Sequence, residues 1–132
     1  HPVGSSNYKT VLGVGGSLGV TLDELVALAD LVLSQGGGSQ PDAIATLNTK
    51  LGEPVWSELA ARFKCPLCFF DAWHLEQQTP RLKNPSEAVF RSVGCHGVAE
   101  AAALAAIGAN GFLVVGKTIS GRATAALAVV QS

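Results

Sequence analysis

The 132-residue sequence contains no methionine, only three cysteines and few charged residues, which make up 14% of the chain. Three cysteines cannot all pair with one another, so we expect no disulfide framework and a reducing, cytoplasmic setting. The longest apolar run, Val98–Ile107, is interrupted by Glu100, which argues against a membrane-spanning segment. Residues 1–7 have neither the basic start nor the apolar stretch of a signal peptide. We therefore expect no membrane partner.

Charge of neither sign dominates, and the formal net charge at neutral pH is −1. Residues 1–61 carry two basic and six acidic side chains, whereas residues 62–132 carry seven basic and four acidic ones. This positive excess is too small for a nucleic-acid-binding protein, but it allows a local basic pocket for an anionic small molecule. Apolar residues make up 48% of the sequence, enough for the core of one domain. We expect that domain to span residues 9–132, after a disordered segment of residues 1–8.

Short apolar segments alternate with helical patterns along the chain. We expect strands at 10–14, 43–47 and 67–70, and helices at 22–35, 54–63, 85–92 and 98–107. The segments 111–116 and 122–130 are apolar, and the sequence KTISG between them is typical of a β-hairpin. This order predicts an α/β fold, a three-layer α/β/α sandwich with a mixed, mostly parallel five-stranded sheet and a C-terminal β-hairpin.

Capping residues mark the ends of the expected helices. Thr21 and Glu24 have the spacing of a capping box, and Gly36 is expected to end the first helix in a left-handed conformation. In Asn84-Pro85-Ser86-Glu87 we expect an Asn84 cap, with Pro85 as the first helical residue. The acidic residues Glu53, Glu87 and Glu100 each lie where a helix N-terminus favours negative charge, which accounts for them without catalysis.

Four glycines follow the first expected strand and lead directly into the next helix: Gly13, Gly15, Gly16 and Gly19. A loop in this place can hold a phosphate, because the free N–H groups of a helix N-terminus face an anion. The spacing fits neither nucleotide fingerprint, since residue 18 is leucine and no Gly-Lys-Ser/Thr follows. Two interpretations stay open, a simple chain turn and a loop that lines a cleft for another ligand.

The cysteines and histidines give no clear catalytic or metal pattern. Cys65-Pro66-Leu67-Cys68 has redox-motif spacing but enters a strand, so two small core thiols are the preferred interpretation. Cys95-His96, between glycines, is expected to be more exposed, yet with Cys65, Cys68 and His74 it lacks the paired spacing of a zinc site. We therefore expect no metal and no cofactor. No nucleophile elbow is present either.

Several motifs together resemble the family formed by CobE and the C-terminal domain of CbiG, which act in cobalamin biosynthesis. The first is GVGGSLGVTLDEL at 13–25, although Gly16, Ser17 and Leu18 stand where the family often has Cys-Arg-Arg. LNTKLGEP at 47–54 is similar to its D-x-K-x-x-E-P pattern. NPSEAVFRSVGCHGVAEAAAL at 84–104 matches its N-P-S-E and V-A-E-A-A-A-L elements. VVGKTISGRATAALA at 114–128 is similar to its last motif, with Lys117, Ser120 and Thr124 in register.

The resemblance implies a domain that binds a precorrin or corrinoid tetrapyrrole intermediate and assists a pathway enzyme or hands the intermediate to one. Such ligands are partly apolar macrocycles rimmed with carboxylates, so we expect a wide glycine-lined cleft with a few cations. The loop 13–19, the segments 84–87 and 94–97, and the hairpin 117–122 are expected to converge there. The expected ligand-binding residues are Gly15, Gly16, Ser17, Gly19, Lys50, Glu53, Asn84, Ser86, Glu87, Gly94, Cys95, His96, Lys117, Ser120 and Gly121.

Two other functions remain open at this stage. The first is a hydrolase-like activity that opens a precorrin lactone with release of a two-carbon fragment, as the resemblance to CbiG implies, with Lys117, Glu53, His96 and Cys95 as candidate catalytic residues. The second is a docking partner of a pathway enzyme that binds no ligand. Lys117 also has a structural interpretation, since a charge at a sheet edge opposes pairing with other strands.

Overall fold

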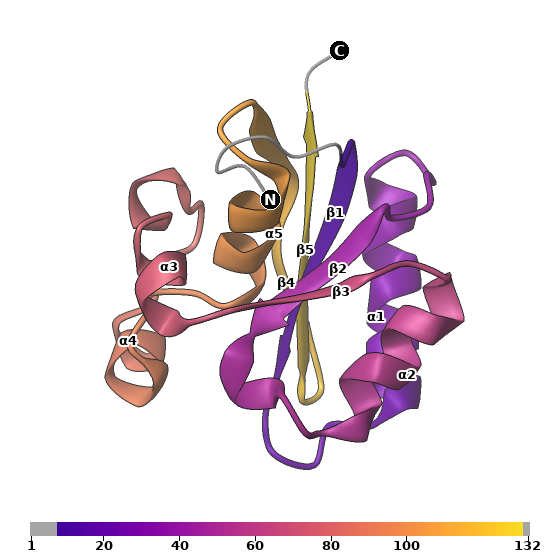
Figure 1. Ribbon diagram of the computed structural model, residues 1–132, viewed down its shortest axis with the longest axis horizontal. Helices are drawn as coiled ribbons and strands as arrows, with labels where there is room; N and C mark the ends of the chain where they lie inside the picture. Colours follow the sequence, from indigo (N-terminus) through magenta and orange to yellow (C-terminus); the bar gives the residue numbers. More distant parts are fainter. Residues whose placement is uncertain (1–7, 131–132) are drawn as a thin grey trace.

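The computed structural model describes residues 8–130 and contains one five-stranded sheet with helices on both faces (Figure 1). The strands are β1 (Thr10–Gly16), β2 (Ala43–Leu47), β3 (Leu67–Phe70), β4 (Gly111–Ser120) and β5 (Ala123–Val130). The helices are α1 (Leu22–Gln35), α2 (Pro54–Phe63), α3 (Ala72–Glu76), α4 (Glu87–Val93) and α5 (Ala99–Ile107), with short 3-10 turns η1 (Asn48–Lys50) and η2 (Thr79–Arg81). The predicted fold class is confirmed.

The sheet order is β3-β2-β1-β5-β4, with β5 antiparallel to both of its neighbours. Strands β1, β2 and β3 pair in parallel, as βαβ crossovers require. Strands β1 to β4 therefore run in one direction and β5 runs in the opposite one. The second strand of the C-terminal hairpin, β5, lies beside β1. The carboxyl ends of β1 and β2 and the tip of the hairpin consequently lie at the same edge of the sheet.

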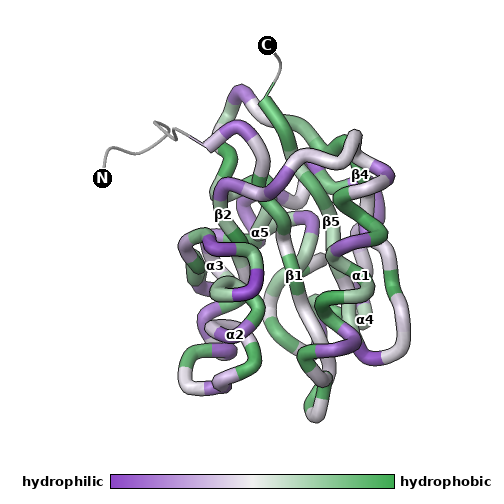
Figure 2. Tube along the Cα trace, turned by 90° about the vertical axis from the view of Figure 1, so that its right-hand side faces the viewer, coloured by the Kyte–Doolittle hydropathy of each residue, from purple (hydrophilic) through white to green (hydrophobic). Residues whose placement is uncertain are grey.

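Two separate cores cover the two faces of the sheet. Helices α1 and α2 pack on one face, where Trp56 is the largest buried side chain, and α5 lies on the other face beside α3 (Figure 1). Strand β5 is apolar along most of its length, as Figure 2 shows. Six of the nine residues of helix α5 are alanine, and the helix approaches β1 very closely, since a Cβ atom added at Gly13 would lie 1.9 Å from the Ala99 carbonyl oxygen. The absence of a side chain at Gly13 makes that contact possible.

Helix α1 begins as predicted, with Thr21 and Glu24 forming the reciprocal capping box. Its end differs from the prediction. Gly36 has an ordinary φ of −89°, and the left-handed residues are Gly37 and Gly38, with φ of 107° and 84°. The Gly38 N–H donates to the Leu33 carbonyl. The left-handed residue that ends the helix is therefore Gly37, one position after the predicted Gly36.

Helix α4 also begins later than predicted. Its cap is Ser86, whose hydroxyl accepts from the Val89 N–H, and the helix runs over Glu87–Val93. Asn84 is not a cap, because its side-chain amide donates to Glu100 instead. Asn84, which the local pattern favoured as the cap, is therefore bound by the distant Glu100, and Ser86 caps the helix instead.

The hairpin is longer and its turn is tighter than predicted. Strand β4 continues to Ser120, which pairs with Ala123, and Gly121 in the turn has a φ of 59°. Strand β4 contains two shifts of register relative to β5, between Leu113 and Val115 and again between Val115 and Thr118. Such bulges commonly redirect side chains beside functional sites.

The predicted disordered segment 1–8 lies outside the described residues except for Tyr8, whose hydroxyl is 3.9 Å from the Cys68 sulfur. Within residues 8–130, no helix has the length and apolar character needed to cross a membrane.

Candidate functional site

A cavity of about 640 Å³ opens at the edge of the sheet where the first loop, the hairpin tip and two helices meet. This volume lies in the range of small-molecule binding sites. One side is built by the glycine loop, the hairpin and η1, and the other by α4 and the start of α5. The lining residues of the first side are Gly15, Gly16, Ser17, Leu18, Leu47, Lys50, Lys117, Ile119, Gly121, Arg122, Ala123 and Thr124; those of the second are Ala88, Val89, Ser92, Val93, Gly97, Val98 and Ala99.

Three cationic side chains line the cavity, and among the described lining residues none is Asp or Glu. The Lys50 ammonium donates to the Gly16 carbonyl at 3.0 Å and lies 5.8 Å from the Trp56 ring centre. Arg122 forms a salt bridge with Glu24 at 2.9 Å. Within the described part of the chain, the Lys117 ammonium has no salt bridge. The cavity therefore carries net positive charge.

The salt bridge at the hairpin tip fixes the orientation of Arg122. Glu24 also accepts from the Thr21 N–H, at 2.9 Å. This bond, with those from Arg122, lowers the pKa of Glu24 to about 2. Glu24 is therefore ionised at neutral pH, and it holds the start of α1 against the hairpin turn.

Strand β1 extends to Gly16, two residues beyond the predicted end at Val14, and two of its glycines have structural reasons to lack side chains. A Cβ atom at Gly15 would lie 2.8 Å from the Thr124 hydroxyl, and one at Gly16 would lie 2.9 Å from Val20. At Gly19 the reason is conformational, since its φ is 86°. The glycines thus bring β5 and α5 close to the end of β1, and this packing shapes the floor of the cavity.

A buried carboxylate lies behind the cationic side of the cavity. Glu100 is 2% exposed and accepts four hydrogen bonds. One oxygen accepts from the backbone N–H groups of Lys83 and Asn84, and the other from the Asn84 side chain and the Lys117 N–H. Glu100 lies in the first turn of α5, as the helix N-terminal interpretation expects, and its carboxylate also joins three segments of the chain.

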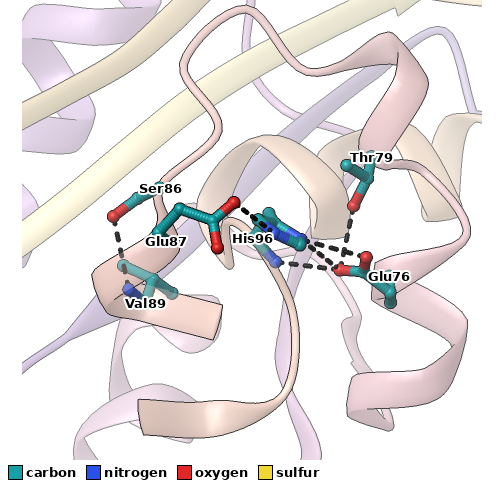
Figure 3. Close-up of polar contacts among 6 residues, drawn as sticks. All are labelled: Glu76, Thr79, Ser86, Glu87, Val89 and His96. Carbon is teal, nitrogen blue, oxygen red and sulfur yellow. Dashed lines mark hydrogen bonds and ion pairs between the residues drawn. The ribbon is translucent and has the colours of Figure 1, made fainter. Parts of the chain in front are cut away.

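A histidine links the two short helices beside the cavity (Figure 3). The imidazole Nδ1 of His96 is 2.9 Å from the Glu76 carboxylate of α3, and its Nε2 is 3.0 Å from Glu87 at the start of α4. The ring stacks on Phe90 with centres 4.4 Å apart. The hydrogen bond to Glu76, together with that to Glu87, raises the pKa of His96 and so favours the imidazolium form, which can donate to both carboxylates.

Comparison with known proteins assigns the chain to one family. Residues 10–128 match the family described as "Cobalamin synthesis G C-terminus". The chain belongs to this family. It is a CobE-like protein of cobalamin biosynthesis, since it is 43% identical over 120 residues to Protein CobE from Sinorhizobium sp., covering 89% of this chain and 78% of that protein.

Solved structures agree with this membership. The crystal structure of CobE, a protein from the cobalamin biosynthetic pathway, superposes with a TM-score of 0.87 at 33% identity over all of both chains. The cobalamin biosynthesis protein chiG from Agrobacterium tumefaciens gives a TM-score of 0.69 at 29% identity, covering 93% of this chain and 99% of the other. The resemblance to the Cobalamin synthesis G C-terminus family is therefore confirmed.

Some of the ligand-binding residues predicted from the sequence line the cavity and others do not. Those that line it are Gly15, Gly16, Ser17, Lys50, Lys117 and Gly121; those that do not are Gly19, Glu53, Asn84, Ser86, Glu87, Gly94, Cys95, His96 and Ser120. Arg122, Thr124 and Val98 line the cavity and were not among the predicted residues. Arg122 had a sequence signal, since it is a cation beside the predicted hairpin turn.

Two of the four catalytic candidates have hydrogen-bond partners, and a third is buried. Glu53 accepts from the indole N–H of Trp56 at 2.9 Å, and His96 is held by its two carboxylates. Cys95, predicted to be more exposed, is fully buried, because the left-handed Gly94 turns the chain inward, and burial raises the pKa of its thiol. Burial also raises the pKa of Cys65, to about 11. No described cluster of three potential ligands forms a metal site.

The His96 bridge predicts a pH-dependent stability. Because the pKa of His96 is raised on folding, its contribution is fully present below the pKa of the unfolded chain, about 6.5, and is lost as pH rises through the folded-state pKa. We expect the melting temperature to fall across this interval, and to fall less in His96→Gln. Melting curves between pH 5.5 and 8.5 measure this effect. The matched variant His74→Gln, at an exposed position, should behave like the wild type, and an unchanged pH profile in His96→Gln would contradict the prediction.

Proposed function

We propose that the protein binds a carboxylate-bearing precorrin or corrinoid intermediate in the cavity and hands it to a cobalamin-pathway enzyme in the cytoplasm. The observation that carries the proposal is the charge of the cavity, which has three cations and no described acidic residue in its lining. Family membership supports an intermediate of cobalamin biosynthesis as the anion.

The two sides of the cavity match the two parts of such a ligand. A corrinoid precursor has a broad, partly apolar ring and a rim of carboxylates. The side built by α4 and α5 offers apolar contacts through Val89, Val93 and Val98, while Lys50, Lys117 and Arg122 lie on the other side. Charged hydrogen bonds to carboxylates are short and strong, so the cations favour a ligand that enters with its acidic rim toward the hairpin.

Binding without turnover agrees better with the placement of the candidate catalytic residues than lactone opening does. Hydrolysis needs an acid or base within hydrogen-bond reach of the reacting atoms. Only Lys117 of the four candidates lines the cavity, whereas Glu53, His96 and Cys95 do not. A carrier requires affinity and a route of release, and an open cavity with cations at its rim provides both.

The decisive experiment is a visible-absorption titration with cobyrinic acid, whose rim carboxylates are free, and with its fully methylated ester. We expect saturable binding of the acid and weaker binding of the ester. Lys117→Ala should weaken binding of the acid about tenfold or more, because a hydrogen bond to a charged group contributes about 1.5–3 kcal/mol. Equal binding of acid and ester, or no binding of either, would contradict the proposal.

The matched control is Arg62→Ala, which removes an exposed cation from α2, a helix that does not line the cavity. Its affinity should equal that of the wild type. Extraction of the bound corrinoid afterwards separates a carrier from an enzyme, since a carrier returns the ligand unchanged. Co-elution with a pathway enzyme in the absence of any ligand spectrum would instead favour a docking protein.

A further inference from the structure

The cavity cation Lys117 lies at an irregularity of the sheet. Val115 of β4 pairs with Leu127 of β5, and the next paired residue of β4 is Thr118, opposite Ala125. Strand β4 therefore advances three residues while β5 advances two, and Gly116 and Lys117 form a bulge. A bulge leaves a backbone group without its partner in the ladder. The Lys117 N–H meets this need by donating to Glu100 at 2.8 Å.

Glu100 is suited to hold the bulge and the adjoining loop together. Its two oxygens accept at 2.8–3.1 Å from Lys117, Lys83 and both the backbone and the side chain of Asn84. An ionised carboxylate only accepts hydrogen bonds, so all four donors are satisfied at once. A protonated acid or an amide in its place would present a donor to at least one of them. The four donors thus match a carboxylate and not an amide.

The bulge has room for the carboxylate because residue 116 is glycine. A Cβ atom there would lie 3.1 Å from the Asn84 side-chain nitrogen and 3.2 Å from a Glu100 oxygen. Helix α5, which carries Glu100, is itself held against β1 at Gly13. The backbone position of Lys117 is therefore fixed by α5 as well as by the partner strand β5.

We propose that Glu100 is a positioning residue that directs the Lys117 ammonium toward the carboxylates of the bound corrinoid. This inference rests on the function proposed above. Glu100 is buried behind the cavity and is not among its lining residues. It acts by fixing the backbone from which Lys117 extends, so its loss weakens recognition of the ligand's charge rather than recognition of its ring.

The test compares Glu100→Gln with Lys117→Ala and with the double variant, each titrated with cobyrinic acid and its methylated ester. Glutamine keeps the shape but offers an amide N–H₂ where two donors converge. We expect the preference for acid over ester to fall about tenfold in both single variants, and no further in the double variant. Glu58→Gln, an exposed carboxylate on α2, is the matched control and should keep the wild-type preference.

A second variant and a second measurement separate positioning from loss of folding. Gly116→Ala leaves the carboxylate in place but crowds it, and should reduce the preference for the acid in the same direction. The ¹H–¹⁵N resonance of Lys117 should shift upfield in Glu100→Gln as its strong hydrogen bond is lost, while distant resonances stay in place.

The outcomes distinguish the two proposals. Absence of an acid preference in the wild type would overturn the proposed function and this role with it. If the wild type prefers the acid and Lys117→Ala does not, an unchanged preference in Glu100→Gln and Gly116→Ala would overturn the positioning role alone. The same conclusion follows if Glu100→Gln reduces the preference as strongly in the Lys117→Ala background as in the wild type.

Discussion

Gly13→Ala is expected to destabilise the protein by about 3 kcal/mol, at the upper end of what overpacking a core costs. The added methyl would lie 1.9 Å from the Ala99 carbonyl oxygen and within 3 Å of the Ala103 backbone nitrogen and its Cβ. Two of these three atoms belong to the backbone of α5, so no rotation of a side chain relieves the clash. The helix must move away from β1 as a unit, and the contacts of its buried alanines with the sheet are lost.

Urea unfolding at equilibrium measures this change as a lower midpoint. The matched control is Gly97→Ala, where the nearest atom is the end of the Leu82 side chain at 3.3 Å, which can give way. We expect the control to lose a small fraction of the free energy of unfolding lost in Gly13→Ala. Equal midpoints for the two variants would show that the close approach of α5 contributes little.

Trp56→Ala is expected to cost about 3–5 kcal/mol, the usual range for removing a large aromatic side chain from a core. Trp56 is fully buried between α2 and the sheet, and its indole N–H donates to Glu53 at 2.9 Å. The ring also lies beneath the Lys50 ammonium, so its loss leaves a void under one wall of the cavity.

Two milder variants divide this effect into its parts. Trp56→Phe keeps most of the buried ring and removes the N–H, so the remaining loss measures the hydrogen bond and the repacking. Glu53→Gln keeps an oxygen acceptor for the indole and should change the free energy of unfolding little. Glu53→Gln should also leave corrinoid binding unchanged; a large loss of affinity would return Glu53 to the candidate site residues.

Local signals predicted much of the fold. The bounds of β2, α2 and β3 agree with the prediction. The two strands are short apolar segments, and the helix begins at a proline and has a basic residue in its last turn. Two of the errors fell where two neighbours were equally suitable. Gly36 and Gly37 both tolerate a left-handed turn, and Asn84 and Ser86 both cap helices. A long-range contact decided the second case, because Glu100 captures Asn84.

The site was less predictable, since its residues come from segments that only the sheet order brings together. The hairpin tip meets the first loop because β5 pairs with β1, and no local pattern in the sequence encodes that neighbour. Arg122 lines the cavity for this reason, and Val98 does so because the start of α5 packs closely against β1. The inward turn at Gly94, which buries Cys95, depends likewise on the packing of α3 against α5.

The position of β5 has a consequence for how the chain is made. This strand is the last of the described strands to leave the ribosome, yet it pairs with β1 at one edge and β4 at the other. Until residues 123–130 emerge, β1 has one open edge, and β4 has no partner. The cavity, whose two sides depend on that closure, is therefore completed only after residues 123–130 have been synthesised, and nascent chains released before residue 123 would expose an unpaired apolar edge.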